Sequence, residues 1–125
     1  MRYIVLILVM LASAVNAHEM TPTYPKLAPS SYEGIYKTTM NMFNKRADVQ
    51  YYEVGVFNKD FKVVPFVTSY SVIKINYLSH VTFDIYVREE DLANAVYICS
   101  QSKIKTEDVT RTAISSRICS KFKND

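Results

Sequence analysis

Apolar and polar residues alternate along much of this chain with a period of two, which is typical of β-strands with one buried face. The clearest alternating run is 80–88, and its apolar face consists of Val81, Phe83, Ile85 and Val87. The same alternation predicts a strand over 35–43, with Met40 and Met42 on one face, and another over 51–57. These runs predict an all-β protein.

The residues between these runs predict turns and further strands. Asn58-Lys59-Asp60 has the composition of a tight turn, after which 61–69 is expected to return as a strand with Pro65 at an edge or a bulge. The range 70–76 is expected to pair with 80–88 as a hairpin, because only a short turn separates the two. The pattern therefore predicts consecutive strands joined by short turns.

The range 18–34 differs from the rest because it contains Pro22, Pro25 and Pro29. Proline has no N–H group to donate, so this stretch cannot form a helix or a central strand. It is expected to be an extended segment at a sheet edge. The range 89–93, with acidic residues at its start, is the one helical turn that the pattern predicts.

Together these elements predict the architecture. About seven short strands at spacings of about ten residues, ending in a hairpin, are typical of an antiparallel β-sandwich of immunoglobulin type. A small barrel is the main alternative architecture.

The last part of the chain predicts a β-hairpin that contains the only two cysteines, each in a copy of the tripeptide Ile-Cys-Ser. A turn within 106–111 and pairing without a bulge would place Cys99 opposite Cys119. One face of this hairpin would then carry Val96, Ile98, Ile104, Ile114, Ile118 and Phe122. The other face would carry both cysteines with Tyr97, Gln101, Lys103, Arg117 and Lys121.

Residues 1–17 resemble a secretory signal peptide. A single basic residue, Arg2, precedes an apolar run, and small residues at 15–17 provide a Val-x-Ala cleavage site. A membrane anchor would need about 20 apolar residues, which is longer than this run. We therefore expect a single domain over 18–125 that is periplasmic or secreted, with no membrane span after the signal peptide is removed.

Export changes the interpretation of the cysteines, because disulfides form in oxidising compartments. The predicted register makes Cys99 and Cys119 a geometrically suitable pair, and the alternative is two buried free thiols. On the chain-entropy model this disulfide would contribute about 3 kcal/mol to stability.

The residues that catalysis requires are scarce. The chain has two histidines and two glycines, so it offers neither an evident hydrolytic triad nor a glycine-rich phosphate loop. The acidic pair at 89–90 is most simply a solvated turn. The net charge is +3, and the basic residues within 101–125 fit a solvated strand face better than a nucleic-acid surface. We therefore expect no enzymatic activity, no cofactor and no nucleic-acid partner.

One metal site is worth stating as an alternative. Cleavage after Ala17 would leave His18 at the amino terminus, where its amine and imidazole could bind copper together with the imidazole of His80. Methionines such as Met40 and Met42 could bind Cu(I), although methionines at alternating strand positions usually pack in a core. The alternative function is thus an exported copper-binding β-sandwich.

The strand pattern over 24–123 resembles the amino-terminal immunoglobulin-like domain of the PapD-like periplasmic pilus-assembly chaperones. The segments that carry the resemblance are Tyr24-Pro25-x-Leu27, Ile35 to Phe43 followed by Asn44, Tyr51 to Phe57, Pro65-Phe66-Val67-Thr68, Val81 to Val87 and Val96 to Cys99. These chaperones lend their last strand to an incomplete pilus subunit, and this β-strand augmentation gives affinity through backbone hydrogen bonds.

The resemblance also implies roles for individual residues. Ile114, Ile118 and Phe122 would be the alternating apolar residues of the partner-binding strand, although packing in the core of the terminal hairpin is the simpler explanation for them. Lys26 and Lys121 lie near the positions at which the family binds the terminal carboxylate of the subunit, and the first of these is usually arginine. The resulting hypothesis is an exported, chaperone-like domain that binds another polypeptide, such as a pilus or surface subunit.

Overall fold

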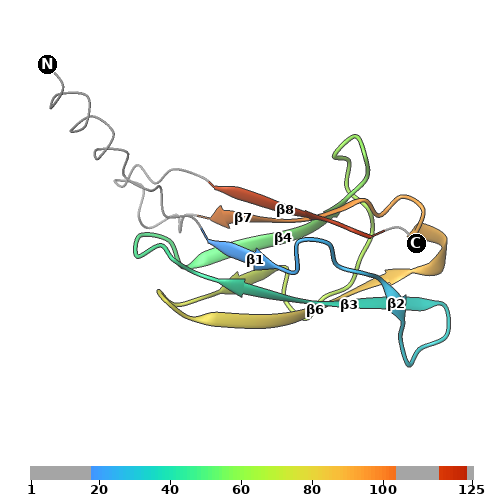
Figure 1. The fold of residues 1–125 in the computed structure, drawn as a ribbon, viewed down its shortest axis with the longest axis horizontal. Helices are drawn as coiled ribbons and strands as arrows, with labels where there is room; N and C mark the ends of the chain where they lie inside the picture. Colours follow the sequence, from blue (N-terminus) through green and yellow to red (C-terminus); the bar gives the residue numbers. More distant parts are fainter. Residues whose placement is uncertain (1–17, 104–115, 124–125) are drawn as a thin grey trace, which may run out of the picture.

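The structure is a computed structural model that describes residues 18–103 and 116–123 (Figure 1). The predicted signal peptide at 1–17, the predicted turn at 106–111 and the side chains of Ile104 and Ile114 lie outside the described residues. Within the described residues, no helix has the length and hydropathy that a membrane span requires.

Two antiparallel sheets of four strands each pack face to face. The first sheet contains β1 (Glu19–Thr21), β2 (Ala28–Pro29), β3 (Ile35–Phe43) and β6 (His80–Arg88). The second sheet contains β4 (Tyr51–Phe57), β5 (Val72–Lys74), β7 (Tyr97–Lys103) and β8 (Arg117–Lys121). This arrangement is the antiparallel immunoglobulin-like β-sandwich that the sequence predicts.

The core lies between the two sheets and follows the predicted alternation. Its fully or almost fully buried side chains include Met40, Met42, Tyr52, Val54, Val56, Ile75, Ile85, Val87 and Ile98. Each of these residues points inward from a strand or from the end of one. The residues that alternate with them along the strands are more exposed. Burying this apolar surface is the main favourable contribution to folding.

The amino-terminal segment forms a sheet edge, as its prolines predict, and changes partner along its length. β1 pairs with β3, and β2 pairs with the other end of β3. Between them, residues 23–25 lie beside the end of β8, where the N–H of Lys121 donates to the carbonyl of Thr23. This segment therefore joins the two sheets along one side of the sandwich.

The predicted hairpin between 70–76 and 80–88 is wrong. β6 pairs with β3 along all nine residues, whereas β5 pairs with β4 in the opposite sheet. The short turn between β5 and β6 carries the chain from one sheet to the other. Alternation shows which face of a strand is buried but does not identify its neighbour, so the short connection was misleading.

The range 61–69 also differs from the prediction, because it contains no extended strand. Val63 and Val67 each form a single bridge, with Phe57 and Tyr86 respectively. Pro65 lies between them and cannot donate to a sheet. The helical turn predicted at 89–93 is present as a 3₁₀ helix over Glu89–Asp91.

Candidate functional site

β8 is an edge strand, and its backbone groups alternate in direction. The N–H of Ser102 donates to the carbonyl of Ser116, and the N–H of Phe122 donates to the carbonyl of Val96. Even-numbered residues of this segment therefore bond with β7. The odd-numbered residues direct their N–H and carbonyl groups away from the sheet, toward the side of the sandwich where β1 lies (Figure 1).

β1 lies beside this outer edge, but within the described residues only the last part of the edge forms backbone hydrogen bonds with the amino-terminal segment. The N–H groups of Lys121 and Lys123 donate to the carbonyls of Thr23 and Pro25, at 3.2 and 2.8 Å. Within residues 18–103 and 116–123, no backbone hydrogen bond uses the N–H groups of Arg117 or Cys119. We call the outward backbone groups of 117–119 the β8 edge. Unbonded backbone groups of this kind are the ones with which an additional strand would pair.

A disulfide fixes this edge to the neighbouring strand. Cys99 and Cys119 lie directly opposite one another, as the predicted register requires, and form a disulfide with a Cα–Cα distance of 4.0 Å. The bond lies on the outer face of the sheet, where Cys99 is buried and Cys119 is exposed. β8 therefore cannot separate from β7 while the disulfide is intact.

The apolar side chains of the predicted partner-binding strand point into the sandwich. Phe122 is 4% exposed, and Ile118 is half-buried against the core. Ile114 lies outside the described residues. In the isolated chain, Ile118 and Phe122 therefore pack in the core, and the part of β8 that is available to a partner is its backbone edge.

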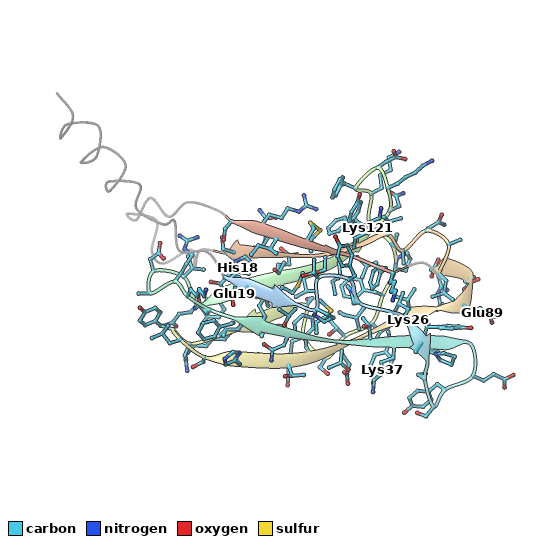
Figure 2. The ribbon with its side chains drawn as sticks, viewed as in Figure 1. His18, Glu19, Lys26, Lys37, Glu89 and Lys121 are labelled. Carbon is cyan, nitrogen blue, oxygen red and sulfur yellow. A yellow bond between two sulfur atoms is a disulfide. The ribbon has the colours of Figure 1, made fainter. Side chains whose placement is uncertain are left out.

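The two lysines expected to bind a carboxylate come from neighbouring segments. Lys121 is exposed on the outer face of β8, and Lys26 is exposed just after the segment 23–25 that pairs with the end of β8. Figure 2 shows Lys121 on β8 and Lys26 further along, toward β2. The backbone places the two residues on the same side of the sandwich.

The two histidines of the alternative copper site are not brought together. The His18 side chain is 1% exposed and lies in the core, where its ring is 4.4 Å from that of Tyr52. The His80 side chain is exposed on the outer face of β6 and stacks on Phe43 at 4.4 Å. The described residues contain no group of three or more His, Cys, Asp or Glu side chains that could hold a metal ion.

Both ring nitrogens of His18 contact serine hydroxyls. Nε2 is 2.7 Å from Oγ of Ser100, and Nδ1 is 3.2 Å from Oγ of Ser116. Burial lowers the pKa of His18 to about 4; a hydrogen bond with Ser100 opposes this shift, and the charge of Arg46 adds to it. His18 is therefore neutral at physiological pH and links β1 to β7 and β8.

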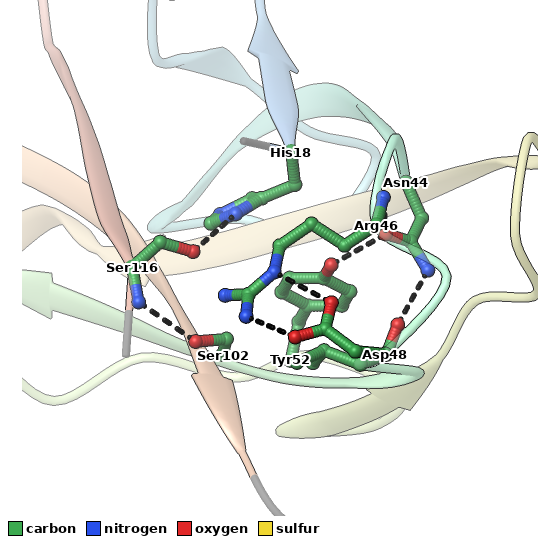
Figure 3. A network of polar contacts seen from close by, with 8 residues as sticks. His18, Asn44, Arg46, Asp48, Tyr52, Ser102 and Ser116 are labelled. Carbon is green, nitrogen blue, oxygen red and sulfur yellow. Dashed lines mark hydrogen bonds and ion pairs between the residues drawn. The ribbon is translucent and has the colours of Figure 1, made fainter. Parts of the chain in front are cut away.

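A second polar group lies next to His18 at the same end of the sandwich (Figure 3). The Tyr52 hydroxyl donates to Oδ1 of Asn44 at 2.6 Å, and the Asn44 amide donates to the carbonyls of Val49 and Ile75 at 2.7 and 2.9 Å. Burial raises the pKa of Tyr52 to about 12, so its hydroxyl keeps its proton. This cluster holds the turn after β3 against both sheets.

An ion pair between Arg46 and Asp48 lies at the same end of the sandwich. Arg46 binds Asp48 through two bonds, from Nε to Oδ1 at 3.0 Å and from Nη2 to Oδ2 at 2.6 Å. The pattern over 44–48 predicts that the chain turns after the strand 35–43, and it does not predict this polar cluster. The residue types in this range suggest only a turn, and the contact with Tyr52 depends on packing between strands.

The outer face of the second sheet, which also carries the disulfide, has an aromatic cluster. The Arg117 guanidinium lies 4.8 Å from the ring centre of Phe57 and 5.3 Å from that of Phe61, and Phe61 stacks on Tyr97 at 4.7 Å. The neighbouring open pocket has a volume of about 310 Å³, and its lining includes Gly55, Cys99 and Arg117. A Cβ atom at Gly55 would lie 2.9 Å from the Phe57 ring, so glycine permits this close packing.

Comparison with known proteins identifies the fold. No protein-family model and no curated protein sequence matches the chain. Among solved structures, the chain is similar to the E. coli chaperone DraB, with a TM-score of 0.64 and 16% identity over 87% of this chain and 54% of DraB. It is also similar to the periplasmic chaperone SfaE, with a TM-score of 0.54 and 13% identity over 85% of this chain and 56% of SfaE.

The chain thus spans about half the length of these two chaperones. At such low identities the similarity concerns the fold alone. It agrees with the immunoglobulin-like chaperone domain that the strand pattern of the sequence resembles. A FixG-related protein from Vibrio parahaemolyticus is also similar, with a TM-score of 0.49 and 13% identity over 86% of this chain and 96% of that protein.

Proposed function

We propose that this chain is an exported, non-enzymatic immunoglobulin-like domain that binds another polypeptide by pairing with the β8 edge. The observation that carries this proposal is the direction of the backbone at Arg117 and Cys119. Their N–H groups point out of the sheet, and no described backbone group bonds to them. The fold similarity to two chaperones supports the same function.

The physical basis is β-strand augmentation. A strand that joins an exposed edge satisfies backbone groups on both partners, so affinity arises largely from main-chain hydrogen bonds. The disulfide favours such binding because it fixes β8 on β7 before the partner arrives, which reduces the entropy lost on association. The disulfide also fits an exported protein.

The side chains that flank the β8 edge favour an acidic or polar segment on the outer face of the partner strand. Arg117 and Lys121 are both exposed there, on either side of Cys119. Opposite charges on adjacent strands stabilise their pairing. In this proposal Lys121, together with Lys26, also attracts a carboxylate of the partner.

Replacement of a single N–H group provides the test. Arg117→Pro removes an outward donor but leaves the bonds to β7, which use even-numbered residues. Arg117→Ala is the matched control because it removes the same side chain and keeps the N–H group. The three proteins are isolated from their native host, and native mass spectrometry measures the polypeptide that remains bound to each.

We expect a bound polypeptide on the wild-type and Arg117→Ala proteins and a large loss on Arg117→Pro. Hydrogen exchange of the complex gives a second measurement, since the amides of Arg117 and Cys119 become protected if a strand pairs there. Equal binding by Arg117→Pro, together with unprotected amides at both positions, contradicts the proposal.

A further inference from the structure

The first sheet also has an unpaired edge, on β6. The N–H groups of Val67 and Tyr86 each donate to the carbonyl of the other at 2.8 Å, on the side of β6 away from β3. Since backbone groups alternate in direction, the backbones of His80, Thr82 and Asp84 also point away from β3. The segment that pairs with Tyr86 does not continue along β6, because Ser71 accepts a bond from the N–H of Val54 in the second sheet.

Unbonded N–H groups extend along this edge from His80 to Asp84. Within residues 18–103 and 116–123, no hydrogen bond uses the backbone N–H groups of His80, Thr82 or Asp84 on that side. The carbonyl of Asp84 on this edge already accepts a bond from Oγ1 of Thr68, at 2.9 Å. We call the outward backbone groups of 80–84 the β6 edge.

We propose that the β6 edge pairs with the β6 edge of a second copy of this chain, forming a two-fold symmetric dimer. If two copies of 80–84 run antiparallel with Thr82 at the two-fold axis, each His80 lies opposite Asp84 of the other copy. All three outward residues then form hydrogen-bonded pairs, because their backbones face the axis. The first sheets of the two copies would become one continuous sheet.

This register is self-complementary in its side chains. Nδ1 of His80 donates to Oδ1 of Asn41 at 3.2 Å, so Nε2 can donate to Asp84 of the second copy when the ring carries a proton on both nitrogens. Asp84 accepts a bond from Thr39 at 2.6 Å through Oδ1, and its Oδ2 lies 3.9 Å from Nζ of Lys37, so His80 of the second copy would share this carboxylate with both groups. Each interface would therefore contain two His80–Asp84 contacts related by symmetry, as isologous dimers require.

Exposed apolar side chains lie at both ends of the β6 edge. Tyr77 and Leu78, which are 51% and 57% exposed, precede His80, and Val67, which is 67% exposed, is bonded to Tyr86 beyond the other end. An antiparallel arrangement brings the first end of one copy beside the second end of the other. Burial of these side chains would add apolar area to the backbone pairing.

The dimer is independent of the proposed partner site, because β6 and β8 lie on opposite sides of the sandwich (Figure 1). Pairing through β6 leaves the β8 edge of each copy uncovered. The assembly would therefore present two equivalent sites for polypeptides, which increases avidity for a partner that carries repeated segments.

Sedimentation equilibrium of the purified, oxidised protein tests the dimer. We expect a concentration-dependent dimer, and His80→Asp should weaken it by about tenfold or more because two acidic pairs then face one another. Thr21→Asp is the control, since it adds the same charge at an exposed position of β1 on the other side of the same sheet. The swapped variant, His80→Asp with Asp84→His, should restore dimerisation.

Cysteine cross-linking tests the register directly. Hydrogen-bonded antiparallel pairs have Cα atoms about 5.5 Å apart, which suits a disulfide, so Thr82→Cys should give a covalent dimer under mild oxidation. Thr21→Cys should not. The proposal is overturned if the protein is monomeric at every concentration. It is also overturned if a dimer forms but His80→Asp does not weaken it and Thr82→Cys does not cross-link it. Loss of the dimer through Arg117→Pro alone also overturns it, since pairing would then occur through β8.

Discussion

Nε2 of His18 lies 2.7 Å from the hydroxyl oxygen of Ser100, although 82 residues separate the two in sequence. His18 directly precedes β1 in the first sheet, and Ser100 belongs to β7 in the second. Their contact therefore fastens the amino-terminal segment across the end of the sandwich. Because the site is buried, the neutral imidazole is strongly favoured, and the pKa of His18 falls to about 4.

Acid should destabilise the protein through His18. Between pH 6.5 and about 4 the unfolded chain binds a proton at this residue while the folded protein does not, so the free energy of unfolding decreases as the pH falls. The loss is up to about 3 kcal/mol, and it is complete below the folded pKa. Urea unfolding at a series of pH values measures it.

His18→Gln provides the control for this pH dependence. Glutamine can still bond with the serine hydroxyls but does not titrate, so the variant should lose less stability than the wild type over the same pH range. Subtracting the two curves also removes the contribution of the carboxylates, which titrate in both proteins. If the two proteins lose stability in parallel, another group is responsible.

Removal of the disulfide should lower stability without changing the fold. Cys99 and Cys119 are 20 residues apart, so the chain-entropy model gives a loss of about 3 kcal/mol for the double variant Cys99→Ala, Cys119→Ala. Thermal unfolding followed by circular dichroism measures the effect. An unchanged midpoint would mean that pairing within the sheet alone restricts this hairpin.

The polar cluster around Asn44 should show energetic coupling. Asn44→Ala removes the partner of the Tyr52 hydroxyl and leaves the carbonyls of Val49 and Ile75 without that donor, so we expect a loss of about 3 kcal/mol. Tyr52→Phe should cost about 1 kcal/mol.

A double-mutant cycle on this pair measures the coupling by urea unfolding. In the Asn44→Ala background the Tyr52 hydroxyl has lost its acceptor, so Tyr52→Phe should cost little or increase stability. Strictly additive effects would show that the 2.6 Å contact contributes no energy of its own.

The sequence predicts the β7–β8 register correctly because both strands carry independent markers of it. Cys99 and Cys119 must approach one another to form a disulfide, and the same register places Val96 opposite Phe122. Both expectations are met, through the disulfide and through the bond from the N–H of Phe122 to the carbonyl of Val96. One pair of opposite residues was enough to predict this register, because in a hairpin without a bulge a single pair determines all the others.

Non-local contacts could not be predicted in this way. The pairing of β6 with β3 joins strands that are far apart in sequence, and alternation within 80–88 fits any apolar neighbour. The position of His18 in the core depends in turn on β1 pairing with β3, and no local pattern around this residue indicates burial. Its sequence context suggested an exposed terminal ligand, whereas the structure gives it a packing role.

The charge at Lys121 should affect partner binding more than folding. Lys121 is exposed on the outer face of β8, so Lys121→Glu should leave the free energy of unfolding nearly unchanged. If an acidic group of the partner lies beside it, binding should weaken by about tenfold, or about 1.4 kcal/mol. Isothermal titration calorimetry with the polypeptide recovered from the native complex measures this change.

Ile118→Asp is the contrasting variant. Ile118 packs against the core, so an aspartate there should abolish binding and also lower stability, and its effect on binding cannot be separated from its effect on folding. Lys121→Glu does not have this drawback. Unchanged affinity in Lys121→Glu would remove the role of this lysine in carboxylate binding, and backbone pairing at Arg117 and Cys119 would then have to account for the affinity by itself.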